Sequence, residues 1–162
     1  MAARSTASFI LTALCLACAC KKAEQTPAPV RQPNVVVITV DTLRADHLGC
    51  YGFESARTPH ADALAARGVR AEHAISAAPI TLPSHASLFT GLYPPAHGVR
   101  DNGKYRLPEN VETLAERVKA GGYRTQAFVS ADVLHHRFNL DQGFDAYDDA
   151  LQSEGDPGMF RI

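Results

Sequence analysis

Two residues offer the most evident chemistry in this sequence, Asp41 and Thr81. Asp41 directly follows a β-branched run, and open parallel sheets bind their ligands beyond the carboxyl ends of the strands. Thr81 stands at the start of a short predicted helix, whose N-terminus favours an anion beside the hydroxyl. Each residue also has a simpler interpretation: Asp41 as a helix cap or turn residue, and Thr81 as an N-cap.

Together the two side chains suggest one mechanism. A divalent cation held by Asp41 could lower the pKa of the Thr81 hydroxyl and neutralise an ester oxyanion. The activated oxygen would then attack phosphorus or sulfur and form a covalent intermediate. Spacing in the sequence does not show that the two residues meet, so the mechanism is a hypothesis at this point.

The segments around these residues alternate between strand and helix patterns. Strands are predicted at 34–40, 69–76 and 123–130, and helices at 58–67, 83–90 and 110–120, with Asn110 as the cap of the last helix. The run at 34–40 (NVVVITV) is typical of a strand buried on both faces of a parallel sheet. This alternation predicts a doubly wound α/β fold. We interpret the acidic stretch 132–156 as a solvated face or a frayed end.

The composition is that of an ordinary globular protein. The chain has 162 residues with 16 basic and 17 acidic side chains, which gives a net charge of −1, and 46% of its residues are apolar. A charge this close to zero excludes nucleic-acid binding through bulk positive charge, so we expect no nucleic acid among its partners.

The first twenty residues are typical of a targeting signal. The apolar run 9–20 has 12 residues. At 1.5 Å per residue it reaches about 18 Å, too short for a bilayer core of about 30 Å. A signal peptide fits better, and the small residues before Cys18 and Cys20 resemble a bacterial lipoprotein cleavage box. Lipidation at Cys20, or else Cys18, would anchor an exported, periplasmic or cell-envelope protein to a membrane, and plain secretion is the alternative. Residues 21–33 then form a proline-rich tether, and 34–162 the folded part.

Three stretches resemble the sulfatase family of the alkaline-phosphatase-like superfamily. They are NVVVITVDTLRADHLGCYG at 34–52, TPHADALAARGVRAEHAISAAPITLPSHASLFTGLYPPAHGVRDNG at 58–103, and LAERVKAGGYRTQAFVSADVLHHRFNLDQGFDAYDD at 114–149. The resemblance implies an alkaline-phosphatase-like doubly wound α/β/α sandwich, present here as its N-terminal part. It also implies a metal-dependent hydrolase of sulfuric or phosphoric esters, small molecules or glycans.

The sequence departs from the family pattern at four places. Thr81 stands where sulfatases carry the cysteine or serine that becomes formylglycine, and His85 takes the place of the arginine in that signature. Oxidation of a threonine would give a ketone rather than the aldehyde. Thr42 replaces the second of the paired aspartates, and the Lys-x-His element expected near Val129 is absent.

The stretch TLPSHASLFTGLYPPAHGVRDN at 81–102 is equally similar to nucleotide pyrophosphatase/phosphodiesterases. That resemblance implies Thr81 as nucleophile, Asp41 as a metal ligand and Asn102 as the oxyanion donor. The turn dipeptide Asn102-Gly103 is the simpler interpretation of Asn102. Thr42 removes a carboxylate that calcium needs more than zinc does, which favours zinc slightly over calcium or magnesium.

Superfamily enzymes run to several hundred residues, so a truncated, non-catalytic lipoprotein is an alternative to the enzyme.

Among the histidines, we expect His97 to brace a loop rather than bind metal. The pair His135-His136 stays unassigned, because adjacent side chains diverge on a helix or a strand.

Overall fold

The computed structural model describes residues 32–150. The chain separates into two compact units, and the boundary between them in the sequence falls between Thr39 and Val40. The described part of the first unit is residues 32–39, which form no helix or strand. The prediction of a strand at 34–40 is therefore wrong as a description of this structure. A parallel strand is defined by hydrogen bonds to neighbouring strands, which a β-branched run cannot supply by itself.

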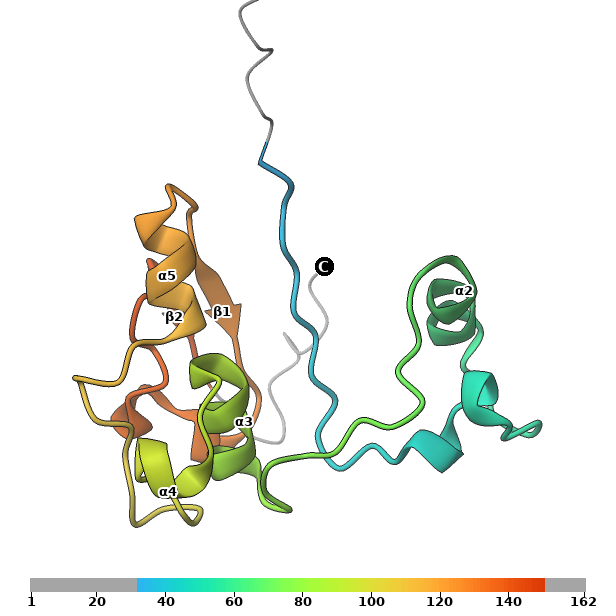
Figure 1. The fold of residues 1–162 in the computed structure, drawn as a ribbon, viewed down its shortest axis with the longest axis horizontal. Coiled ribbons are helices and arrows are strands. Elements are labelled where there is room, and N and C mark those ends of the chain that lie inside the picture. The colour runs from blue at the N-terminus through green and yellow to red at the C-terminus, as the bar shows by residue number, and fades with distance from the viewer. Residues whose placement is uncertain (1–31, 151–162) are drawn as a thin grey trace, which may run out of the picture. The chain divides into compact units, whose positions relative to one another are not determined.

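Short helices dominate the second unit (Figure 1). In chain order its elements are η1 (Ala45–His47), η2 (Gly49–Tyr51), α2 (Pro59–Arg67), α3 (Thr81–Thr90), α4 (Pro94–His97), α5 (Leu114–Ala120), β1 (Gln126–Phe128), η3 (Asp132–Leu134), η4 (His136–Phe138) and β2 (Ala146–Asp148), where η denotes a 3-10 helix. The strand expected at 69–76 is absent, and Val69 and Ile75 there are exposed. No helix within residues 32–150 is long and apolar enough to span a membrane.

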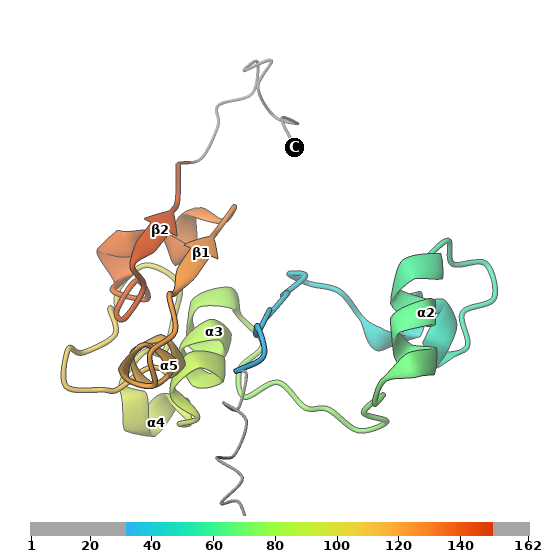
Figure 2. The same ribbon diagram turned by 90° about the horizontal axis from the view of Figure 1, so that it is seen from above.

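The two strands lie side by side and run in the same direction (Figures 1 and 2). Gln126 pairs with Ala146 and Phe128 with Asp148, and the Val129 amide donates to the Asp148 carbonyl at 2.9 Å. The chain between the strands carries η3 and η4, so it leaves the carboxyl end of β1 and returns to begin β2 parallel to it. The predicted strand at 123–130 is confirmed in its central three residues.

The core of this unit is formed by α3 together with the loops and 3-10 helices around it. Helix α3 packs against α4, α5 and η3. The buried cluster consists of Leu82, Ala86, Val99, Leu107, Leu134, Phe138 and Leu140. Because two of these residues lie in the first two turns of α3, burial fixes the start of that helix most firmly.

The starts of α3 and α5 differ from the predicted ones. Helix α3 begins at Thr81 after an Ile80 cap, so Thr81 is not an N-cap. Helix α5 begins at Leu114 rather than near Asn110. Thr113 accepts the Glu116 amide at 3.2 Å, and the Glu116 carboxylate accepts the Thr113 amide at 2.7 Å. This reciprocal capping box satisfies two free N–H groups, which a cap at Asn110 would leave unpaired.

The described part of the acidic stretch is solvated at Asp132, Asp145 and Asp148, which are exposed, but it is not a frayed end, because strand β2 lies within it. The Asp145 carboxylate pairs with Lys119 at 2.8 Å and accepts the Thr125 amide at 2.9 Å, and these contacts lower the pKa of Asp145 to about 2. Gly143 adopts φ +85°, and a Cβ atom there would lie 2.3 Å from the Glu116 amide nitrogen. The chain thus passes the first turn of α5 at a distance that only glycine allows.

Candidate active site

The Thr81 hydroxyl and the Asp41 carboxylate meet in the structure. Thr81 Oγ1 donates to Asp41 Oδ2 at 3.0 Å, across 40 positions of sequence. The other carboxylate oxygen accepts the Thr42 hydroxyl at 3.2 Å, and Thr42 itself adopts φ +60°. Both oxygens of Asp41 therefore face threonine hydroxyls, one of them on the first residue of a helix anchored in the core.

Asn102 lies at the same helix start. Its Oδ1 atom accepts the Leu82 amide at 2.9 Å. This bond satisfies one of the N–H groups that a helix leaves unpaired at its beginning. A backbone N–H can only donate, so the bond also assigns the amide oxygen and turns the Asn102 nitrogen, a donor, away from Leu82. Asn102 therefore contacts the residue that directly follows Thr81 in α3.

His85 occupies the next turn of α3. Its Nδ1 atom lies 2.8 Å from the Thr81 carbonyl oxygen. A carbonyl only accepts, so Nδ1 carries the hydrogen. The imidazole is thereby fixed to the backbone of the residue that carries the candidate nucleophile.

His97 braces this region from the interior. It is fully buried, its Nδ1 accepts the Val99 amide at 3.1 Å, and its Nε2 lies 2.9 Å from the Ser87 hydroxyl of α3. Since Nδ1 accepts, Nε2 carries the hydrogen and donates to Ser87. Burial lowers the pKa of His97. The bracing role predicted for His97 is confirmed, because its two ring nitrogens join the Val99 amide to the Ser87 hydroxyl of α3.

Comparison with known proteins identifies the family. The sulfatase family model matches residues 33–157. This chain belongs to the sulfatase family. The match includes every residue of the site described above.

Individual sulfatases match the chain at similar levels. Steryl-sulfatase from Mus musculus is 36% identical over 141 residues, which is 75% of this chain and 22% of that protein. An ulvan-active sulfatase from Formosa agariphila is 38% identical over 142 residues, or 84% of this chain and 27% of the relative. The structure of a 2-O GAG sulfatase superposes with a TM-score of 0.59 at 31% identity, covering 74% of this chain and 26% of that one. The chain thus spans about a quarter of the length of these relatives.

The structural likeness confirms the fold class as alkaline-phosphatase-like α/β, of which this chain is the N-terminal part. Sulfatases generally use a divalent metal, and the site offers part of a suitable ligand set. Asp41 and Thr81 present oxygen atoms, the ligand type that hard cations and zinc both accept. Within residues 32–150, Asp41 belongs to no group of three or more His, Cys, Asp or Glu side chains that could hold an ion. These residues therefore supply two ligands and not a complete set.

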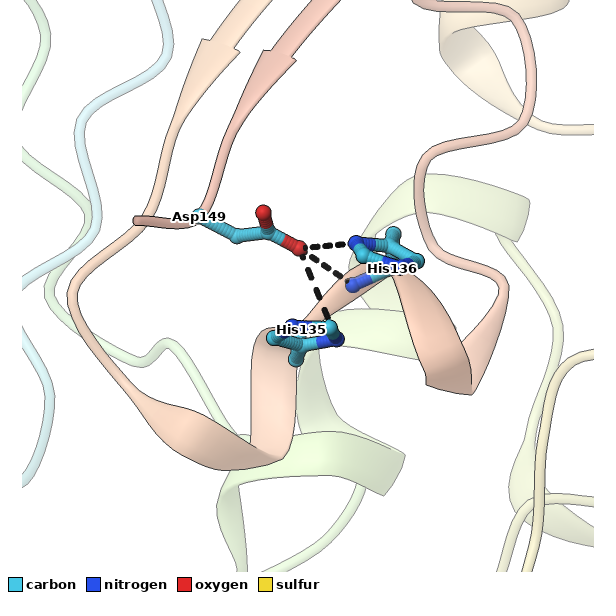
Figure 3. Close-up of side chains that lie close together, drawn as sticks. All are labelled: His135, His136 and Asp149. Carbon is cyan, nitrogen blue, oxygen red and sulfur yellow. Dashed lines mark hydrogen bonds and ion pairs between the residues drawn. The ribbon is translucent and has the colours of Figure 1, made fainter. Parts of the chain in front are cut away.

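A group of that kind does occur elsewhere in the described chain, and the sequence analysis missed it. His135, His136 and Asp149 each place a potential ligand atom within 4.8 Å of the others (Figure 3). The two imidazole rings lie 4.0 Å apart between centroids. Asp149 Oδ2 accepts both the His136 amide at 2.6 Å and, at 2.7 Å, the His136 Nδ1 hydrogen.

The adjacent histidines converge because they are not in a regular element. His135 has φ −56° and ψ 149°, an extended residue between the two 3-10 helices. The rule that neighbouring side chains diverge holds only within a helix or a strand. The signal that could have found the group is the parallel pairing of β1 with β2, which places the residues that follow the two strands at one edge of the sheet, but the three-residue β2 has no strand pattern in the sequence.

Proposed function

We propose that the protein containing this chain is a metal-dependent hydrolase of sulfuric esters with Thr81 as its nucleophile. The observation that carries the proposal is the 3.0 Å hydrogen bond from the Thr81 hydroxyl to Asp41. It joins a residue near the beginning of the described chain to a helix start, in a chain that belongs to the sulfatase family. Aryl, steroid or glycan sulfates are the substrate classes suggested by the names of the relatives.

Each residue of the site has a proposed role. Asp41 orients the Thr81 hydroxyl, so that its oxygen points toward the ester. The side-chain nitrogen of Asn102 donates to the oxygen that gains negative charge on sulfur or phosphorus, a contribution that is typically worth about 10²–10³ in rate. His85 positions the first turn of α3 through its bond to the Thr81 carbonyl. As Thr81 Oγ1 bonds to the central atom, its proton passes to the departing ester oxygen, which leaves as an alcohol. Water then cleaves the covalent intermediate, releases sulfate or phosphate and restores the Thr81 hydroxyl.

Asp41 and Thr81 are the residues of this chain that would hold the metal. A bound divalent ion would lower the pKa of the threonine hydroxyl and offset charge on the ester. We propose zinc over calcium or magnesium, because Thr42 leaves one carboxylate here and calcium needs six to eight oxygen ligands where zinc needs four. Metal analysis of protein purified without added metal tests this. A bound calcium that is lost in Asp41→Asn, with the zinc content unchanged by that substitution, would contradict it.

Phosphoric esters are the second candidate substrates. Thr81 cannot form the aldehyde that sulfatases derive from cysteine or serine, and an unmodified threonine hydroxyl with a nearby asparagine suits phosphoryl transfer. A phosphodiesterase or nucleotide pyrophosphatase activity is therefore the specific alternative. The placement of Asn102 beside the start of α3 supports it.

Turnover of three substrates separates these activities. The protein, as its gene encodes it, is assayed with an aryl sulfate, an aryl phosphomonoester and an aryl phosphodiester, with zinc or calcium supplied. We expect Thr81→Ala to lower turnover by several orders of magnitude, as loss of a nucleophile does. Thr90→Ala is the matched control: it lies at the other end of α3, where its hydroxyl donates to the Ala86 carbonyl.

A second variant separates catalysis from folding. Asn102→Asp keeps an oxygen for the Leu82 amide but replaces the nitrogen donor with an acceptor. It should therefore fold like the parent and lose on the order of 10² or more in kcat. Equal inactivity of the parent on all three substrates would remove the enzyme and favour a non-catalytic lipoprotein.

We also propose that the protein is exported and anchored to a membrane through lipid on Cys20, with Cys18 as the alternative. Both cysteines, and the predicted signal peptide and most of the tether, lie outside the described residues. Intact mass and membrane fractionation of Cys20→Ser and Cys18→Ser variants test the proposal. A soluble, unlipidated parent protein would favour plain secretion.

A further inference from the structure

We propose a second metal site on this chain, a His₂Asp centre for a borderline divalent cation such as Zn²⁺, formed by His135, His136 and Asp149. It is separate from the Thr81–Asp41 pair and does not depend on the proposed function. The three side chains are the one group in residues 32–150 with enough clustered ligand atoms to hold an ion. Figure 3 shows both imidazoles turned toward the same carboxylate oxygen.

The distances suit a small cation. Asp149 Oδ2 lies 2.7 Å from His136 Nδ1 and 3.6 Å from His135 Nδ1. Ligand atoms on a tetrahedral zinc ion, at about 2.0–2.2 Å from the metal, are roughly 3.3 Å apart. The two observed separations bracket that value, so each needs to change by less than about 1 Å to reach it. The ion would also displace the Arg137 amide, which His135 Nδ1 now accepts at 3.2 Å. A cation bound here replaces the hydrogen that His136 now shares with Asp149.

The elements that carry the ligands are held by the core. Leu134 precedes the histidine pair and Phe138 follows it, and both side chains are buried. The Tyr147 hydroxyl of β2 donates to the Leu134 carbonyl at 2.6 Å, which ties the strand before Asp149 to the 3-10 helix before His135. The ligands are thus positioned before any ion arrives, which reduces the entropy lost on binding.

Charge and access also fit a cation. One carboxylate and two neutral imidazoles give a donor set of charge −1, and nitrogen ligands favour zinc, nickel or copper over calcium or magnesium. The neighbouring Arg137 is paired with Asp132 and stacks on Phe138. The Asp149 side chain is 15% exposed and that of His136 59% exposed, so solvent reaches the site from the His136 side and can supply a fourth ligand.

Zinc titration of the full, tag-free chain tests the proposal. Asp41→Asn is placed in every protein, so that an ion at the Thr81 site does not enter the count. In this background we expect one Zn²⁺ per chain. His135→Gln, His136→Gln and Asp149→Asn should each weaken binding about tenfold or more, since even the loss of an outer-sphere partner costs about 10–100-fold. His73→Gln, a change at an exposed histidine, is the control and should bind like the parent.

A spectroscopic readout separates ligation from folding. Co²⁺ bound in place of zinc should give the intense visible bands of a tetrahedral ion, and His136→Gln should remove them. Thermal melting without metal shows which variants fold, and His136→Gln decides the result if Asp149→Asn does not fold. Absence of zinc binding, affinity unchanged in the His136 and Asp149 variants, or equal binding of Ca²⁺ would overturn the proposal in favour of a simple His136–Asp149 ion pair.

Discussion

Helices α3 and α2 have similar sequence signals and very different surroundings. They contain 10 and 9 residues, each has a proline in its first turn, and each is followed by a glycine. Helix α3 buries Leu82, Pro83, Ala86 and Ser87, whereas α2 buries no residue. The signals that start and stop a helix are local, but burial of one face depends on the rest of the fold.

The difference explains where the candidate chemistry lies. Thr81, Asn102 and His85 all depend on the first turns of α3, which the core holds in place. Helix α2 contacts η2, and Thr58 and Asp62 tie it to the backbone of that short turn. A reactive hydroxyl needs positioning to within a fraction of an ångström, and only the buried helix provides it.

The largest effect is expected from truncating one leucine in each helix. Leu82 is fully buried and Leu64 is 64% exposed. Leu82→Ala should therefore lower the free energy of unfolding by about 2–5 kcal/mol, while Leu64→Ala should change it by about 0.5 kcal/mol or less. Chemical denaturation of the two variants measures the difference. Equal losses would show that α2 is as firmly packed as α3.

A smaller effect is expected at the glycines that end the helices. Gly91 after α3 adopts φ +69° with open space around its Cα, whereas Gly68 after α2 has φ −115°. Gly91→Ala should cost about 1–2 kcal/mol, because an L-residue in the left-handed region crowds its own backbone. Gly68→Ala should cost less, because φ is negative there, and the 3.2 Å contact of its Cβ with the Leu64 carbonyl oxygen needs a shift of only a few tenths of an ångström. The same unfolding assay decides, and a costly Gly68→Ala would contradict this contrast.

The third expected effect is a pH dependence of the free energy of unfolding, caused by His97, which is bonded to α3. Burial lowers its pKa below the ordinary value of 6.5, so the unfolded chain takes up the proton first as the pH falls. His97 thus contributes stability that is fully present above pH 6.5 and is lost as the pH falls through the folded-state pKa. The slope in that window is at most about 1.4 kcal/mol per pH unit.

Denaturant unfolding at pH values on both sides of this window tests the effect. His97→Gln should be less stable than the parent at neutral pH but should lose less stability on acidification. His73→Gln, at an exposed position, should follow the parent curve. Parallel curves for the parent and His97→Gln would show that His97 does not titrate differently in the folded chain.

The sequence predicted the helices better than the strands, for a physical reason. Helices α2 and α3 appear within two residues of their predicted bounds, because their hydrogen bonds are local and their proline and glycine signals are explicit. The strands predicted at 34–40 and 69–76 do not form in the structure. Strand formation depends on partners far along the chain, and β-propensity says nothing about where they are.

The candidate site residues were likewise predicted only in part. Asp41, Thr81 and Asn102 were found through strand-end position, helix-start position and family resemblance, and the structure brings all three to the start of α3. The His135–His136–Asp149 group was missed, because the expected divergence of adjacent side chains applies only within a regular element. A parallel pairing of β1 with β2 was needed to bring Asp149 to it, and three-residue strands are too short to register in a periodicity analysis.

The amino acids that position 143 accepts can report whether variants of this chain keep the native fold around α5. Any other amino acid would place a Cβ atom 2.3 Å from the Glu116 amide nitrogen, on a backbone with φ +85°. In a saturation library screened for folded protein, codon 143 should return glycine alone, whereas the exposed Ala146 three residues later should accept many amino acids. The codon frequencies at 143 would therefore report whether the chain still passes α5 in its native path, in any longer or membrane-attached form of the protein and without a substrate.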